Sequence, residues 1–142
     1  MNRIDDLIIK GKLKKTTFSD DMVKKEFELC KCDLEDARIS FMEQRYKWST
    51  IQGYYSIFHA IRALIFRAGY REESHTALKI AFDELYIKSK KLDKIIYETL
   101  ERGMMLRENA DYKGSFSEQG ANFLIKNVEL SIKKIEEFLS AV

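Results

Sequence analysis

Residues 51–69 (IQGYYSIFHAIRALIFRAG) place His59 and Arg62 in a run that is otherwise almost entirely apolar. On a helix, Arg62 falls in the middle of an apolar stripe made by Ile51, Tyr55, Phe58, Ile65 and Phe66. An arginine in such a stripe must reach water, pair with a carboxylate, or face a shared cavity or a partner chain. We expect a carboxylate or carbonyl partner, to be sought first among Asp111, Asp36 and Glu35.

Residues 106–112 (LRENADY) contain a second group of charged or polar side chains that could bind a ligand, Arg107, Asp111 and Tyr112, and Lys113 follows them. Two interpretations of Arg107 stay open. A cation near a helix C-terminus is favoured by the helix dipole. Alternatively, the guanidinium lines a cleft and binds phosphate, which its planar fork of donors suits. The residues expected to bind a ligand are Arg62, Arg107, Asp111 and Lys113.

The chain has two histidines, His59 and His75, and each also has an ordinary structural interpretation. His59 on an apolar helix can be a hydrogen-bonded core residue, and His75, after Ser74, can be a partly exposed residue at a helix start. Acid–base chemistry at a phosphate ester would need one of them beside a phosphate-binding cation. The candidate catalytic residues are therefore Arg107, His59 and His75, with the role of each unknown.

The composition favours one helical domain over residues 1–142. Apolar residues make up 45% and charged residues 34%, and the chain has no proline and six glycines, which favours long uninterrupted helices. The 25 basic and 23 acidic side chains nearly cancel. A net charge of +2 gives no general field for nucleic acid, so any such contact must be a local patch.

Several function classes find no support in the sequence. No apolar run approaches the ~20 residues that span a bilayer, and the N-terminus lacks a signal-peptide core. We therefore expect a cytoplasmic protein with no membrane contact. No metal-binding motif and no phosphate-binding glycine loop is present, so we expect neither a metal nor a cofactor. Cys30 and Cys32 point to different sides of a helix and cannot pair.

Apolar periodicity predicts an all-α fold, an up-and-down antiparallel bundle of five to six helices. A short N-terminal helix over 2–14 belongs to an extension over 1–18. Helices follow over 20–46, 48–68, 78–85 and 92–107, and a last one runs to Leu139. We expect Gly69 to stop the third helix and residues 108–117 to form a loop. Ser115 and Glu118 have the spacing of a capping box for the last helix.

Three pieces of sequence in a fixed order resemble the HEPN superfamily. They are YYSIFHAIRALIFRAG at 54–69, SHTAL at 74–78, and R-x-x-A-D-Y at 107–112, which leads into a final amphipathic helix. The resemblance runs from about Phe27 to Leu139. It is greatest to the small stand-alone HEPN proteins that are encoded beside minimal nucleotidyltransferases in archaea and bacteria. It implies a helical bundle, a homodimer, a polar groove and a nucleotidyltransferase partner.

The ribonuclease branch of that family carries an arginine followed after four to six residues by a histidine. Arg107 matches the arginine, but no histidine follows it, and Asp111 is an acid that is normally ionised at neutral pH. We therefore expect little or no ribonuclease activity. In such systems the partner can transfer a nucleotide to a tyrosine beside the motif, and Tyr112 is the nearest match.

The sequence favours a HEPN-type binding and regulatory module, one half of a toxin–antitoxin-like pair that binds nucleotide or RNA. Two alternatives stay open. One is a metal-independent endoribonuclease with a degenerate site that uses Arg107 with His59 or His75. The other is a purely structural dimeric scaffold. Convergence of Arg62, Arg107, Asp111 and the two histidines across a dimer would support a site, and their scatter would support a scaffold.

Overall fold

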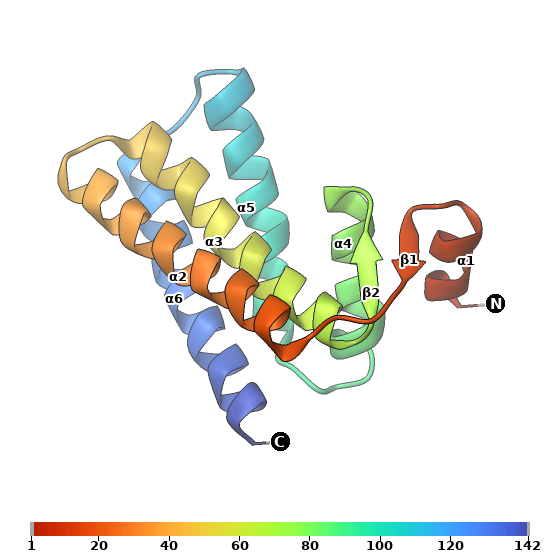
Figure 1. Ribbon diagram of the computed structural model, residues 1–142. Coiled ribbons are helices and arrows are strands. Elements are labelled where there is room, and N and C mark those ends of the chain that lie inside the picture. The colour runs from red at the N-terminus through yellow and green to blue at the C-terminus, as the bar shows by residue number, and fades with distance from the viewer. Residues whose placement is uncertain (1, 142) are drawn as a thin grey trace.

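The computed structural model of the protein describes residues 2–141, and four long helices dominate it (Figure 1). They are α2 (Asp20–Met42), α3 (Tyr46–Arg67), α5 (Lys94–Tyr112) and α6 (Glu118–Ser140). α2 and α3 form one antiparallel pair and α5 and α6 another, each joined by a short connection at the same end of the molecule (Figure 1). The predicted all-α antiparallel bundle is thereby confirmed.

α3 is the central helix, in contact with α2, α5 and α6. Side chains on both sides of it have 0% exposure, among them Ile57, Ile61, Leu64 and Ile65. The stripe predicted to be its main apolar side is buried at Ile51, Phe58, Ile65 and Phe66 and partly exposed at Tyr55 and Arg62. The opposite side is buried as well, as expected for a helix that is apolar almost all round.

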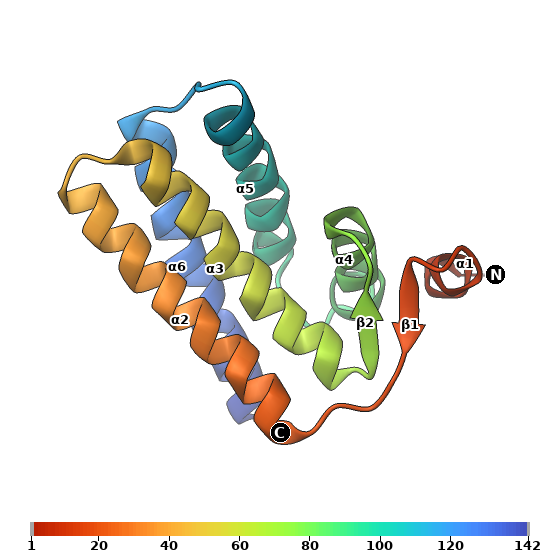
Figure 2. The same cartoon turned by 45° about the horizontal axis from the view of Figure 1, so that its top comes forward.

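A smaller layer lies beside the bundle, on the side of α3 and α5 (Figure 2). It contains α1 (Arg3–Ile9), the strands β1 (Leu13–Lys15) and β2 (Tyr70–Glu72), α4 (His75–Phe82) and a π-helical turn, η1 (Asp83–Ile87). β1 and β2 pair antiparallel, with Leu13 opposite Glu72. The predicted helix over 2–14 is too long, because Gly11 adopts a φ of +71° and ends it early.

Gly69 stops α3 as predicted, one residue beyond the C-cap Ala68 and with a φ of +89°. It also brings the N-terminal segment close. The Gly69 carbonyl accepts a hydrogen bond from the Thr16 amide at 2.9 Å, and a Cβ at this position would lie 3.3 Å from the Thr16 carbonyl oxygen. One glycine therefore both ends the helix and starts the strand that pairs with β1.

Two predicted helix ends are wrong in the bundle itself. α2 ends at Met42, since Gln44 adopts a left-handed backbone with a φ of 63°, a turn that no glycine or proline marks. α5 continues to Tyr112, because residues 108–112 contain no helix breaker and the first left-handed residue is Gly114. Arg107 therefore lies inside a helix, and its interpretation as a cation at a helix C-terminus is wrong.

The start of α6 is also shifted. Ser117, and not Ser115, is its N-cap, with its hydroxyl accepting a hydrogen bond from the Gly120 amide at 2.9 Å. The apolar periodicity of this helix is confirmed, since its inward side chains are buried: Ala121, Leu124, Ile125, Val128, Ile132 and Ile135. The buried side chains of α6 complete the core between α3 and α5.

Candidate functional site

Arg107 lines a pocket of about 310 Å³ between α3, α4 and α5, here called the Arg107 pocket. The other residues that line it are Tyr54, His75, Thr76, Met104, Glu108 and Tyr112. The Arg107 side chain is 16% exposed, and its Cζ lies 5.3–5.8 Å from the ring centres of Tyr54, Tyr55 and Tyr112. Three aromatic rings thus surround a cation that faces an open space.

The guanidinium of Arg107 keeps most of its donors free for a ligand. Among the residues described, it makes one hydrogen bond, from Nη2 to the Tyr55 hydroxyl at 2.9 Å. Its Nε is buried with no hydrogen-bond partner and lies 3.8 Å from the nearest carboxylate oxygen, that of Asp111. Since a guanidinium has five N–H donors, this arginine can still bind an anion in bidentate fashion.

His75, the first residue of α4, lies in the same pocket. Its Nδ1 is hydrogen-bonded to the Tyr54 hydroxyl, and its ring stacks on Phe58 with 4.5 Å between ring centres. Burial lowers the pKa of the His75 imidazole below its ordinary value, and the positive charges of Arg107 and Arg62 lower it further. The imidazole is therefore neutral at neutral pH.

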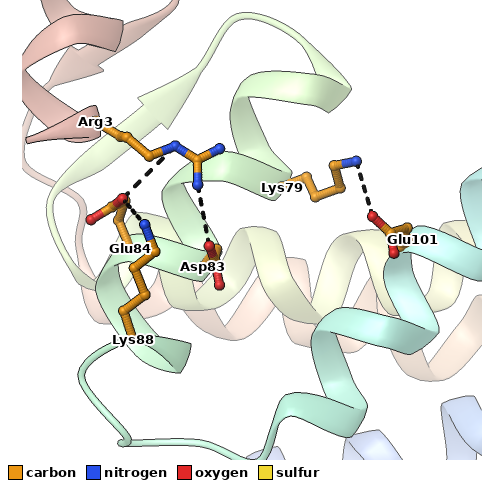
Figure 3. Close-up of polar contacts among 6 residues, drawn as sticks. All are labelled: Arg3, Lys79, Asp83, Glu84, Lys88 and Glu101. Carbon is orange, nitrogen blue, oxygen red and sulfur yellow. Dashed lines mark hydrogen bonds and ion pairs between the residues drawn. The ribbon is translucent and has the colours of Figure 1, made fainter.

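Contacts on two sides of α4 hold His75 against α3 and α5. Ser74 caps the helix by accepting a hydrogen bond from the Ala77 amide at 3.0 Å. Figure 3 shows Lys79 reaching Glu101 of α5, at 3.5 Å, while Arg3 of α1 binds the acids at the start of η1. α1 thus contacts η1 on one side, and α5 contacts α4 on the other.

The other residues predicted around Arg107 lie at the end of α5. Asp111 is exposed and is the i+4 partner of Arg107, Tyr112 is 72% exposed, and Lys113 is the exposed C-cap. The hydroxyl end of Tyr112 can therefore reach solvent while its ring covers the guanidinium. All three stand beside the pocket, on or directly after a rigid helix and not in the predicted loop.

Arg62 belongs to a different group of charges, here called the Arg62 cluster, with Glu26, Asp33, His59 and Glu72. Its Nε lies 3.1 Å from a Glu72 carboxylate oxygen, and its Nη1 lies 3.5 Å from Glu26. A carboxylate partner is thus confirmed. The acids expected first, Asp111, Asp36 and Glu35, are wrong. Asp111 is on α5, whereas Arg62 lies beside β2 and the first turns of α2, where Glu26 is, and not beside the later turns of α2 that carry Glu35 and Asp36.

His59 also joins the Arg62 cluster. Its Nδ1 lies 2.7 Å from Glu26, and its Nε2 lies 3.7 Å from Asp33. Phe58 lies between the two groups, since its ring contacts both Arg62 and His75. The structure therefore brings Arg107, Asp111, Tyr112 and His75 together and places Arg62 and His59 elsewhere.

Four residues that line the Arg107 pocket are not among the predicted site residues: Tyr54, Thr76, Met104 and Glu108. Tyr54 is buried, at 1% exposure, and its hydroxyl is hydrogen-bonded to His75. The spacing within 54–69 cannot indicate this contact because it depends on where α4 packs. The order of the 74–78 and 107–112 motifs was the available signal that the two segments share one site.

Neither a metal site nor a membrane helix is found among residues 2–141. No three His, Cys, Asp or Glu side chains there are arranged to hold a metal ion. No helix in the same range combines the length and apolarity needed to cross a bilayer.

The chain belongs to the HEPN family, since the model of the HEPN domain matches residues 27–142. A UPF0332 protein of Thermotoga maritima is 28% identical over 109 residues, which cover 77% of this chain and 79% of that one. Two proteins of Methanocaldococcus jannaschii, each named a "putative toxin", are 22% and 23% identical over 119 and 116 residues. These matches cover 82% and 81% of this chain and 81% and 87% of theirs.

Proposed function

We propose that this protein is a HEPN-type binding and regulatory module that binds a nucleotide or an RNA in the Arg107 pocket. One observation carries the proposal: a mostly buried guanidinium with unused donors faces a pocket between aromatic rings. Arginine donors suit phosphate, and an exposed tyrosine ring suits a base. A pocket of about 310 Å³ lies at the small end of the usual range for ligand sites, which suits one nucleotide unit.

The toxin names of two relatives support placing the protein in a toxin–antitoxin-like pair. Its partner in this proposal is a minimal nucleotidyltransferase that modifies Tyr112. The Tyr112 oxygen would attack the α-phosphate of a nucleoside triphosphate, lose its proton, and displace pyrophosphate. Because the Tyr112 ring lies 5.3 Å from the Arg107 Cζ, the attached phosphate would be within reach of that guanidinium.

The binding test uses a labelled single-stranded RNA and AMP, with Arg107→Ala compared with Arg102→Ala. Arg102 is a matched control because it stands on the same helix, exposed, over Phe123 on another face. We expect salt-sensitive binding that falls at least tenfold in Arg107→Ala, as loss of hydrogen bonds to a charged group requires. Equal affinity in the two variants, or no binding by the wild type, would contradict the proposal and favour a purely structural scaffold.

The modification test is separate. The purified chain is incubated with a candidate transferase and ATP, and its mass is measured. One added nucleotide on the wild type and none on Tyr112→Phe would support the proposal. Modification of another residue, for example Tyr97 or Tyr70, would contradict the assignment of Tyr112.

A second candidate function is a metal-independent endoribonuclease, favoured by the presence of His75 in the same pocket as Arg107. Cleavage would need a group that accepts the proton of the ribose 2′-hydroxyl beside the cation. An RNA digest with wild type, Arg107→Ala, His75→Ala and His59→Ala separates the two functions. We expect no cleavage above background, and efficient cleavage lost in a histidine or arginine variant would establish the enzyme instead.

A further inference from the structure

We propose that His75 binds a phosphate oxygen of the ligand as a neutral hydrogen-bond donor, through Nε2, beside the oxygen that Arg107 binds. The inference rests on the proposed function and deepens it by adding a residue from α4. This residue lies outside the 107–112 motif, and its role follows from its contact with Tyr54.

The Tyr54 hydroxyl determines which nitrogen of His75 carries the proton. Tyr54 is 1% exposed, and among the described residues its hydroxyl has a single hydrogen-bond partner, Nδ1 of His75. A buried hydroxyl proton needs an acceptor, so Tyr54 donates and Nδ1 accepts. The proton of the neutral imidazole is then on Nε2.

The same contact opposes ionisation of the ring. An imidazolium would carry a proton on Nδ1 as well. Nδ1 could then no longer accept the hydrogen bond from the Tyr54 hydroxyl, and two protons would point at each other between the two groups. Burial raises the pKa of the Tyr54 phenol, so Tyr54 cannot relieve the conflict by losing its proton near neutral pH. His75 is therefore held as a donor at Nε2 and an acceptor at Nδ1.

The charges around the ring agree with this assignment. The titratable and charged groups that face it are Tyr54, Tyr55 and Arg62 of α3 and Arg107 and Glu108 of α5. The two arginines disfavour a second positive charge on the imidazole, and Glu108 favours it only weakly because it is exposed. Arg107 thus supplies the charge for the anion, and His75 supplies a directed N–H.

Nε2 is available to a ligand. Within residues 2–141 it has no hydrogen-bond partner, and His75 and the next residue, Thr76, line the pocket from the N-terminal end of α4. A nitrogen that already holds a proton cannot accept one from a ribose hydroxyl. His75 in this state binds the phosphate group without acting as the base of a cleavage reaction.

The test measures the affinity of the full-length protein for a labelled single-stranded RNA, with AMP as the competitor. His75→Ala removes the donor, His75→Gln keeps an N–H donor near the position of Nε2, and His59→Gln is the control from the Arg62 cluster. We expect about tenfold weaker binding for His75→Ala and changes within about twofold for the other two. The melting temperature of each variant shows whether it is folded.

The protonation state is tested by repeating the titration between about pH 6.5 and about pH 8, the range in which an ordinary histidine loses its charge. A neutral donor predicts that the His75-dependent part of the affinity stays constant. A tenfold loss per pH unit that disappears in His75→Gln would overturn the proposal, as would full affinity in a folded His75→Ala. Either result, with Arg107→Ala still defective, would leave the proposed function intact, whereas loss of the Arg107 dependence would contradict both.

AMP distinguishes the source of the phosphate. Competition at concentrations near its own dissociation constant indicates that a terminal phosphate occupies the pocket. RNA binding that AMP does not displace indicates an internucleotide phosphodiester. Both results keep the His75 contact, provided that the His75→Ala defect appears with the probe that binds.

Discussion

Arg62 and Arg107 are both held among aromatic rings, yet their partners give them different roles. Arg62 lies within 3.5 Å of carboxylates from two elements, Glu26 of α2 and Glu72 of β2, so its charge is offset inside the fold. Among residues 2–141, the carboxylate nearest to Arg107 is that of Asp111, which is 3.8 Å away and exposed. We infer that Arg62 joins β2 to the bundle and that Arg107 is available to a ligand.

Removal of the Arg62 charge should destabilise the protein. In Arg62→Met, Glu72 stays buried without its cation, and we expect a loss of about 2–4 kcal/mol in the free energy of unfolding. The double variant Arg62→Met/Glu72→Gln should recover part of that loss because it no longer buries an unpaired carboxylate. Denaturant titration measures both, and an unchanged melting temperature and assembly state in Arg62→Met would show that the residue is merely on the surface.

His75 should make the fold sensitive to mild acid. Its folded-state pKa lies below the ordinary value of 6.5, so below that pH the unfolded chain takes up the proton more readily than the folded one. Stability from this residue is present above about pH 6.5 and is lost as the pH falls toward the folded-state pKa. The wild type should therefore lose more stability than His75→Gln between about pH 7 and about pH 5, and parallel curves would contradict the burial argument.

At the residue scale, the sequence predicted Arg107 from its residue type and position and Tyr112 from the family resemblance, and both line the same pocket. It also predicted that Arg62 has a carboxylate partner. It could not identify Glu72 as that partner, since this acid comes from a three-residue strand in the middle of the chain, and that strand pairs with β1 near the N-terminus. The contact of His75 with Tyr54 likewise depends on long-range packing.

At the scale of elements, the continuity of α5 matters most for the site. Arg107, Asp111 and Tyr112 share one helix, so their relative positions are fixed by its geometry. Periodicity predicted the existence of every long helix. It failed to predict where two of them end. α5 continues until just before Gly114, which adopts a left-handed backbone, and α2 ends just before Gln44, which does so although it is not a glycine.

The corrected start of α6 gives a direct test at this scale. Ser117→Ala removes the hydrogen bond to the Gly120 amide and should cost about 1 kcal/mol of stability. Ser115→Ala is the matched control, because the Ser115 hydroxyl caps nothing among the described residues, and it should change stability by less than about 0.5 kcal/mol. If thermal unfolding shows a larger loss of stability for Ser115→Ala than for Ser117→Ala, the N-cap is Ser115, as the capping box in the sequence predicts.

At the scale of the whole molecule, we expect a twofold homodimer. The expectation rests on the family resemblance, because α2, α5 and α6 already cover the apolar α3 inside the bundle. A twofold interface would bring two copies of one surface together. Exposed apolar side chains on α5 and α6, Met105, Phe123 and Leu130, offer one surface for such contact. Sedimentation at concentrations on the order of tens of micromolar should give a dimer, and a monomer under those conditions would remove the claim.

We propose the Arg107 pocket as the place where this HEPN protein binds its ligand. The most direct measurement is a crystal structure of the wild type soaked or grown with a short single-stranded RNA or with AMP. The predicted result is a phosphate group within hydrogen-bond distance of the Arg107 guanidinium and the His75 Nε2, with a base against Tyr112. A ligand bound only outside this pocket, for example in a second pocket, which Arg102 and Met105 of α5 and Phe123 of α6 line, would contradict the proposed binding site.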